Sequence, residues 1–140
     1  MIVELVGVAD IDKIWPKVVG DVTRCLRKAP TDVGAGDVWV NCRSGQWFLI
    51  IVHDGETIHG TTVWRFANGY FECLVLAGRD LKHWLHDLID TATRLAKLNE
   101  CRGLIASGRP GFMTLFKKHL PQAKAIRVTH AMEFGPCLHQ

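Results

Sequence analysis

A pair of histidines is the first group in this chain with a spacing that could support chemistry. His83 and His86 are three positions apart, and two imidazoles at that spacing on one helix face can bind zinc. No cysteine or carboxylate completes the set at a diagnostic spacing. We therefore interpret the pair as part of a solvated helix face and predict no metal site.

A Gly/Pro turn is the second candidate. The segment Ser107-Gly108-Arg109-Pro110-Gly111 could hold an anion through the backbone amides of a helix N-terminus, with Arg109 adding charge. A turn that only starts a helix explains the same residues more simply, and we prefer it.

Cysteine and tryptophan fit a buried role better than a chemical one. The five cysteines are an odd number with wide spacings and no C-x-x-C, which favours reduced thiols over a disulfide framework or a zinc knuckle. Cys73 and Cys101 have no histidine placed beside them by the sequence, so we expect small buried residues rather than nucleophiles. The five tryptophans lie in apolar stripes and are expected in the core, with Trp64 the strongest candidate for a base-stacking surface.

The elements that must position these residues begin with a strand and helices. Met1 to Val8 is typical of a short strand, and Asp10 is a candidate N-cap for the helical pattern that follows. Pro16 lies too deep for the first turn of that helix, so we expect a break there and a longer second piece opened by the proline. Asp37 to Gly45 fits either a strand or a short helix.

The middle of the chain predicts three consecutive antiparallel strands. Trp47 to Val52 is apolar on both faces, Ile58 to Phe66 alternates, and Asn68-Gly69 is a strong hairpin turn before Tyr70 to Ala77. The later elements follow the same logic: a helix from Leu81 to Leu98 capped by Asp80, a strand from Gly103 to Ala106, a helix from Pro110 to about His119, and a strand from Ile126 to Phe134.

This order of elements resembles the GCN5-related N-acetyltransferase (GNAT) fold over residues 1–134, with residues 135–140 as a C-terminal tail. The length of 140 residues and the globular balance of 48% hydrophobic and 22% charged residues suit one such domain. The resemblance implies an α/β (α+β) fold with a mixed, mostly antiparallel sheet flanked by helices.

Two family features are altered in this chain. The resemblance implies a phosphate loop of the form (Q/R)-x-x-G-x-(G/A) after the fourth strand, but Leu76 to His83 has one early glycine and Asp80, which would cap the helix and repel an anion. The family's acid tyrosine has Leu115 and Phe116 in the matching stretch, and the single tyrosine, Tyr70, is at the hairpin. Glu72 could serve as a general base, although a solvated or paired strand glutamate is the favoured interpretation.

These departures favour a non-catalytic protein. The size, the topology, the turn at residues 108–112 and the closing Met132-Glu133-Phe134 are similar to small GNAT-like proteins of tailed phages and prophages, some of which are virion components. We expect a virion-associated interaction protein with no catalytic residue and no cofactor, located in a virion or in the bacterial cytoplasm. The alternative is an acetyl-CoA-dependent N-acetyltransferase with an atypical cofactor loop, and a weaker alternative is a phage protein that binds a host factor or DNA.

The distribution of charge along the chain indicates what kind of partner the protein binds. The net charge is only +3, but residues 101–140 contain six basic residues and one acidic residue, a net of +5. We expect a docking face for an acidic protein surface, with nucleic acid the weaker choice and no membrane span. The residues of this face are Arg102, Arg109, Lys117, Lys118 and Arg127.

Overall fold

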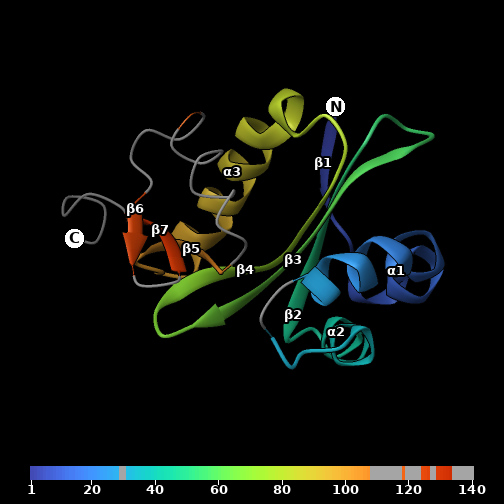
Figure 1. The fold of residues 1–140 in the computed structure, drawn as a ribbon, viewed down its shortest axis with the longest axis horizontal. Helices are drawn as coiled ribbons and strands as arrows, with labels where there is room; N and C mark the ends of the chain where they lie inside the picture. Colours follow the sequence, from blue (N-terminus) through green and yellow to red (C-terminus); the bar gives the residue numbers. More distant parts are fainter. Residues whose placement is uncertain (29–30, 108–117, 119–123, 127–128, 134–140) are drawn as a thin grey trace.

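One mixed sheet forms the centre of the fold (Figure 1). The computed structural model describes residues 1–28, 31–107, 118, 124–126 and 129–133. The strand order is β1-β2-β3-β4-β5-β7-β6, and every neighbouring pair is antiparallel except β4 and β5. The strands are β1 (Ile2–Leu5), β2 (Trp47–His53), β3 (Ile58–Ala67), β4 (Tyr70–Gly78), β5 (Gly103–Ser107), β6 (Lys124–Ile126) and β7 (Thr129–Glu133). The predicted mixed, mostly antiparallel sheet is confirmed.

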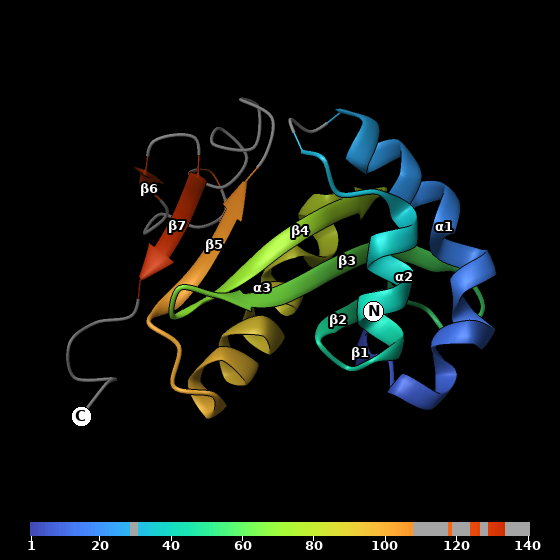
Figure 2. The same cartoon turned by 90° about the horizontal axis from the view of Figure 1, so that it is seen from below.

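Helices cover both faces of the sheet, with α1 and α2 on one face and α3 on the other (Figure 2). They are α1 (Ile11–Lys28), which follows a 3-10 turn over Val8–Asp10, then α2 (Ala35–Arg43) and α3 (Leu81–Leu98). Alternate strand residues feed the two cores, so Leu49 and Ile51 face α1 while Ile50 and Val52 face α3. Among the helices of the described segments, none has the length and apolar character to cross a membrane.

The three predicted central strands and the long helix after them are confirmed. Asn68 and Gly69 both have positive φ, at 53° and 83°, as the tight turn between β3 and β4 requires. The predicted apolar stripe of α3 is buried at Trp84, Leu85 and Leu88.

Trp64 lies in the same core, only 2% exposed, and its indole N–H donates to Thr62 Oγ1 at 2.8 Å. Its ring stacks on Phe71 with the centroids 5.0 Å apart. A base-stacking role for Trp64 is therefore wrong, and its place on a buried strand face is the reason.

The expected break at Pro16 is also wrong. The helix α1 runs without interruption from Ile11 to Lys28 with the proline inside it. Pro16 lies on the exposed side of α1, where water can hydrate the carbonyl of Asp12 that loses its helical donor. The open choice at Asp37 to Gly45 resolves to a helix, α2, and Gly45 follows it with a φ of 81°.

The C-terminal part differs from expectation in one described feature. A single strand from Ile126 to Phe134 is wrong, since β6 and β7 pair antiparallel with each other and β7 pairs with β5. The helix expected over Pro110 to His119 lies outside the described residues except for Lys118, which is helical. The tail 135–140 lies outside them too, so the single-domain boundary stays a prediction.

Leu88 tests the packing of α3. Its side chain is fully buried in the core between α3 and the sheet. We expect Leu88→Ala to lower the free energy of unfolding by about 2–5 kcal/mol, because the substitution loses apolar burial and leaves a cavity. Chemical denaturation of both proteins measures the difference. The exposed Leu98, 79% exposed at the end of the same helix, is the control, and equal losses at the two positions would contradict the assignment.

Candidate functional site

The two parallel strands of the sheet separate soon after they meet. Strand β4 pairs with β5 only at Phe71–Leu104, Glu72–Ile105 and Cys73–Ala106, although β4 continues to Gly78. Opposite β3, Val63 pairs with Val75 while Trp64 pairs with Cys73, so one extra residue bulges in β4 at this point. A bulge bends its strand and increases its twist. The second half of β4 is thereby turned away from β5.

This separation leaves one edge of β4 without a described strand. The amide of Arg79 donates to the carbonyl of His59 at 3.0 Å, which fixes the phase of the β3–β4 ladder. Because antiparallel pairs alternate, the peptide groups of Leu76 and Gly78 point away from β3 and into the opening. The thiol of Cys25 donates to the Leu76 carbonyl at 3.8 Å, as this orientation requires.

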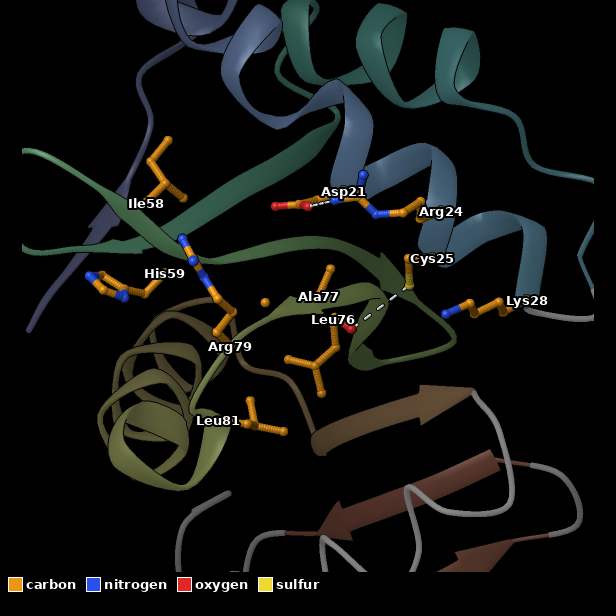
Figure 3. A pocket seen from close by; sticks show the side chains of 11 residues that line it. Asp21, Arg24, Cys25, Lys28, Ile58, His59, Leu76, Ala77, Arg79 and Leu81 are labelled. Atoms are coloured by element: carbon orange, nitrogen blue, oxygen red, sulfur yellow. Dashed lines mark hydrogen bonds and ion pairs between the residues drawn. The ribbon is translucent and has the colours of Figure 1, made fainter.

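A cavity of about 540 Å³ lies beside the end of β4 (Figure 3). Its walls come from α1, the start of β3, the end of β4 and the first turn of α3. The lining residues are Asp21, Arg24, Cys25, Lys28, Ile58, His59, Leu76, Ala77, Gly78, Arg79 and Leu81. Arg24, Lys28 and Arg79 bring positive charge, and the one carboxylate, Asp21, forms an ion pair with Arg24. The cavity therefore favours an anion.

The loop from β4 to α3 has a backbone shape that only glycine permits at its first position. Gly78 has a φ of 143°, and a Cβ there would lie 2.2 Å from the His59 carbonyl oxygen. Below the loop, Trp84 donates its indole N–H to the Arg79 carbonyl at 2.7 Å. The loop is thus held both by the β3 backbone and by a core residue.

Asp80 occupies the N-cap position of α3, as predicted, but does not cap the helix with its side chain. Its φ of 54° is left-handed, and its carboxylate accepts no hydrogen bond from the helix. Within the described chain, the amides of Asp80, Leu81 and Lys82 have no hydrogen-bond acceptor. The expectation that Asp80 satisfies these amides is wrong, because its backbone is left-handed and not in the extended conformation from which an N-cap side chain bonds to them. Donors remain available at the mouth of the cavity.

The turn between β2 and β3 supports the same end of the site. Asp54 Oδ2 lies 2.8 Å from His59 Nε2, and Asp54 Oδ1 accepts the amides of Thr57 and Glu56. The hydrogen bond from His59, followed by those from the two amides, holds the pKa of the Asp54 carboxyl well below its usual range. This network fixes His59, and the carbonyl of His59 accepts the hydrogen bond from the Arg79 amide.

Glu72 is paired, as the favoured interpretation expected. Its Oε1 accepts from Arg65 Nε at 2.6 Å, and its side chain is 11% exposed. Glu72 lies one residue before the last β4–β5 pair, so it stands where the opening begins. Tyr70 begins β4 at the hairpin and lies under the guanidinium of Arg102, 5.0 Å from the ring centroid.

The structure brings few of the other sequence candidates together. Cys73 and Cys101 are buried, which confirms their structural role, and His83 and His86 lie on the exposed side of α3. No group of three potential metal ligands occurs among the described residues.

Of the proposed basic face, only Arg102 and Lys118 lie within the described residues, and both are exposed. The other three, Arg109, Lys117 and Arg127, lie outside them. The face therefore stays a prediction.

The sequence interpretation missed the contribution of α1. Asp21, Arg24 and Lys28 are spaced three and four residues apart and form a polar stripe beside the buried stripe of Val18 and Val22. That spacing was a signal for a shared face. The spacing alone does not show that this face borders the end of β4. The contact that reveals it joins Cys25 to Leu76, which are 51 positions apart in the sequence.

Comparison with solved structures identifies the architecture. The PaiA N-acetyltransferase from Thermoplasma acidophilum, solved with coenzyme A, matches with a TM-score of 0.63 and 11% identity over 96% of this chain and 100% of that chain. A GNAT-family acetyltransferase from Staphylococcus aureus Mu50 matches with a TM-score of 0.66 and 9% identity over 96% and 99%. The chain has a GNAT-like fold. A Brucella melitensis GNAT acetyltransferase solved with acetyl-CoA matches with a TM-score of 0.58 and 12% identity over 96% and 88%. No family model and no curated protein matches the sequence.

These findings correct the expected function. The expectation of a non-catalytic phage or virion protein is contradicted, since the GNAT-like structures that match are acetyltransferases, among them complexes with coenzyme A and acetyl-CoA. The expectation relied on the altered loop and on the missing tyrosine. It gave no weight to the separation of β4 from β5 or to the cavity beside the end of β4.

Thiol reactivity tests the geometry of the cavity. In a Cys137→Ser background, we expect Cys25 to be alkylated first at about pH 8, because it lines the cavity and is half-buried. Burial raises the pKa of the Cys42 thiol to about 11, and it also raises the pKa of Cys73 and Cys101, so few reactive thiolates form there. Peptide mass spectrometry after timed iodoacetamide treatment measures the order. Labelling of Cys42 or Cys73 as fast as Cys25 would show that the packing is different.

Proposed function

We propose that the protein is an acetyl-CoA-dependent N-acetyltransferase. The observation that carries the proposal is the cationic cavity at the open edge of β4, at the point where α3 begins. The matching acetyltransferase structures support it, because two of those described above contain coenzyme A or acetyl-CoA. The altered loop changes how the cofactor is held.

The residues of the cavity fit the phosphate end of acetyl-CoA. Arg24, Lys28 and Arg79 would neutralise phosphate charge, and guanidinium groups bind phosphate oxygens with charge-assisted hydrogen bonds. The amides of Leu81 and Lys82 would add donors at the N-terminus of α3. The side chains of α1 thereby replace part of what later loop glycines supply in the family.

The exposed peptide groups of β4 fit the extended arm of the cofactor. The peptide groups of Leu76 and Gly78 point into the opening, where they can bond to an amide-bearing chain laid along the strand edge. The absence of a side chain at Gly78 lets such a chain approach closely. When bound, acetyl-CoA supplies an activated acetyl thioester.

The protein would then act by holding an amine against that thioester. Alignment of two reactants in one site supplies a large part of the rate increase in such transfers. Among the described carboxylates, Glu72 is placed where β4 and β5 separate, with Oε1 fixed by Arg65. We assign it the acceptance of the amine proton as the amine nitrogen bonds to the acetyl carbon. The carbon–sulfur bond would break in that transfer, and the coenzyme A thiolate would leave and take a proton from solvent.

Calorimetric titration with coenzyme A tests the proposal. We expect binding with a Kd of about 1–100 μM, since the cations offset the phosphate charge. Arg24→Glu combined with Arg79→Glu should weaken binding at least about tenfold, because each reversal repels a phosphate. Lys13→Glu combined with Arg27→Glu changes the net charge equally at exposed positions outside the cavity, and its affinity should stay near the parent value.

Protection of Cys25 from alkylation by acetyl-CoA, which has no free thiol to consume the iodoacetamide, locates the binding at the cavity. A parent protein that neither binds coenzyme A nor gains this protection would refute the proposed function.

Asp80 is expected to weaken cofactor binding. Asp80→Asn keeps a residue type that tolerates the left-handed backbone and removes the negative charge beside the α3 amides. We expect coenzyme A to bind about two- to fivefold more tightly, as for relief of an unfavourable charge at a helix terminus. Asp87→Asn, on the exposed side of α3, is the control in the same titration. Weaker binding by Asp80→Asn would mean that the carboxylate contributes to the site.

A further inference from the structure

Exposed apolar side chains gather at the β1 edge of the sheet. Within the described residues, seven large apolar side chains are exposed, and four of them lie on β1 or next to it. These four are Met1, Ile2, Leu5 and Val8, which are between 42% and 54% exposed. Single exposed apolar residues are ordinary on a protein surface, whereas a cluster marks a contact surface.

The backbone of β1 offers hydrogen bonds at the same edge. The strand lies at the end of the sheet order and, among the described strands, pairs only with β2 (Figure 1). The amide of Val6 donates to the Leu49 carbonyl at 2.9 Å, so Val6, Glu4 and Ile2 bond to β2 by alternation. The peptide groups of Val3 and Leu5 therefore point outward.

The edge lacks the usual protection against pairing. Sheet edges are commonly blocked by lysine, proline or a bulge, and β1 has none of these. Its one charged residue, Glu4, is bound by His53, with Oε1 2.7 Å from Nε2. The edge is therefore open to another strand.

A groove beside β1 carries both signs of charge. It has a volume of about 710 Å³ between the start of the chain and α3, with Met1 and Val3 on its floor side and Asp87, Asp90 and Arg94 on the helix side. Two copies related by a two-fold axis would each present carboxylates and a guanidinium to the other. Because the groove carries both signs of charge, two copies would not repel each other there as two surfaces of one sign would.

We propose that β1 pairs with β1 of a second copy, antiparallel and centred on Val3, to form one continuous sheet through two molecules. In this register the outward peptide groups of Val3 bond to those of the second copy's Val3. Leu5 then faces Met1, and Glu4 faces Ile2, so apolar side chains cover one another.

Charge excludes the neighbouring register. Shifting the pairing by one step of the hydrogen-bond pattern centres it on Glu4 and places the two Glu4 carboxylates directly opposite each other. Like charges at facing positions are destabilising. Of these two registers, only the one centred on Val3 avoids this repulsion.

Sedimentation equilibrium over a wide concentration range tests the proposal. We expect the parent protein to change from monomer to dimer as concentration rises. Ile2→Glu combined with Leu5→Glu should remain monomeric, because the new carboxylate at position 2 faces Glu4 of the second copy and repels it. Val40→Glu combined with Leu98→Glu changes two exposed apolar residues elsewhere, and this control should dimerise like the parent.

Crosslinking tests the register. Val3→Cys should give a covalent dimer under mild oxidation that the parent does not give, since facing residues in such a pair lie within disulfide reach. Circular dichroism of each variant checks that the fold is kept.

Two results would overturn the proposal. A parent that stays monomeric at every concentration would leave the edge to a strand from another protein. Dimerisation of the Ile2→Glu, Leu5→Glu variant at parent strength would place the interface elsewhere. Both results are independent of coenzyme A binding.

Discussion

The peptide groups in the second half of β4 have a described strand partner on one side only. Backbone donors and acceptors must be satisfied, so the free edge has to be met by solvent, side chains or a ligand. The Leu76 carbonyl takes the weak donor of Cys25, which places α1 against the opening. The position of α1, the cationic lining and the start of α3 are all arranged around that unpaired edge.

The shape of the site and its charge come from different residues. Gly78, with its close approach to His59, and Trp84, with its bond to the Arg79 carbonyl, fix the path of the loop. The side chains of Arg79, Asp80 and Lys82 are exposed, and they determine the electrostatic field at the mouth of the cavity. A loop that lacks the family's later glycines can keep the required path because the first glycine and the tryptophan hold it. The positive charges of Arg24 and Lys28 on α1 offset the negative charge of the Asp80 carboxylate.

Local patterns were sufficient for the elements whose signals are local. The Asn68-Gly69 turn and the stripe of α3 were predictable because a hairpin and an amphipathic helix depend on neighbours in sequence. Pro16 misled because its tolerance depends on which side of α1 meets water, and only the packed helix shows that. The cavity was beyond sequence reasoning, since it depends on where β4 leaves β5 and on Cys25 meeting Leu76 across 51 positions. Asp80 was recognised, but its left-handed φ was not, and that angle reverses the inference about capping.

In the β4–α3 loop, the residues that fix the backbone path differ from those that set the charge, and this affects which substitutions the protein can accept. A change at Gly78 or Trp84 alters the backbone path, so selection on the fold alone restricts both positions. Changes at Arg79, Asp80 or Lys82 leave the packed core untouched, because these side chains lie in solvent. Single substitutions at these three positions can therefore change the charge of the loop without unfolding the protein. The solved structures that match this fold share only 9–15% identity with the chain, so the fold itself tolerates wide changes of sequence.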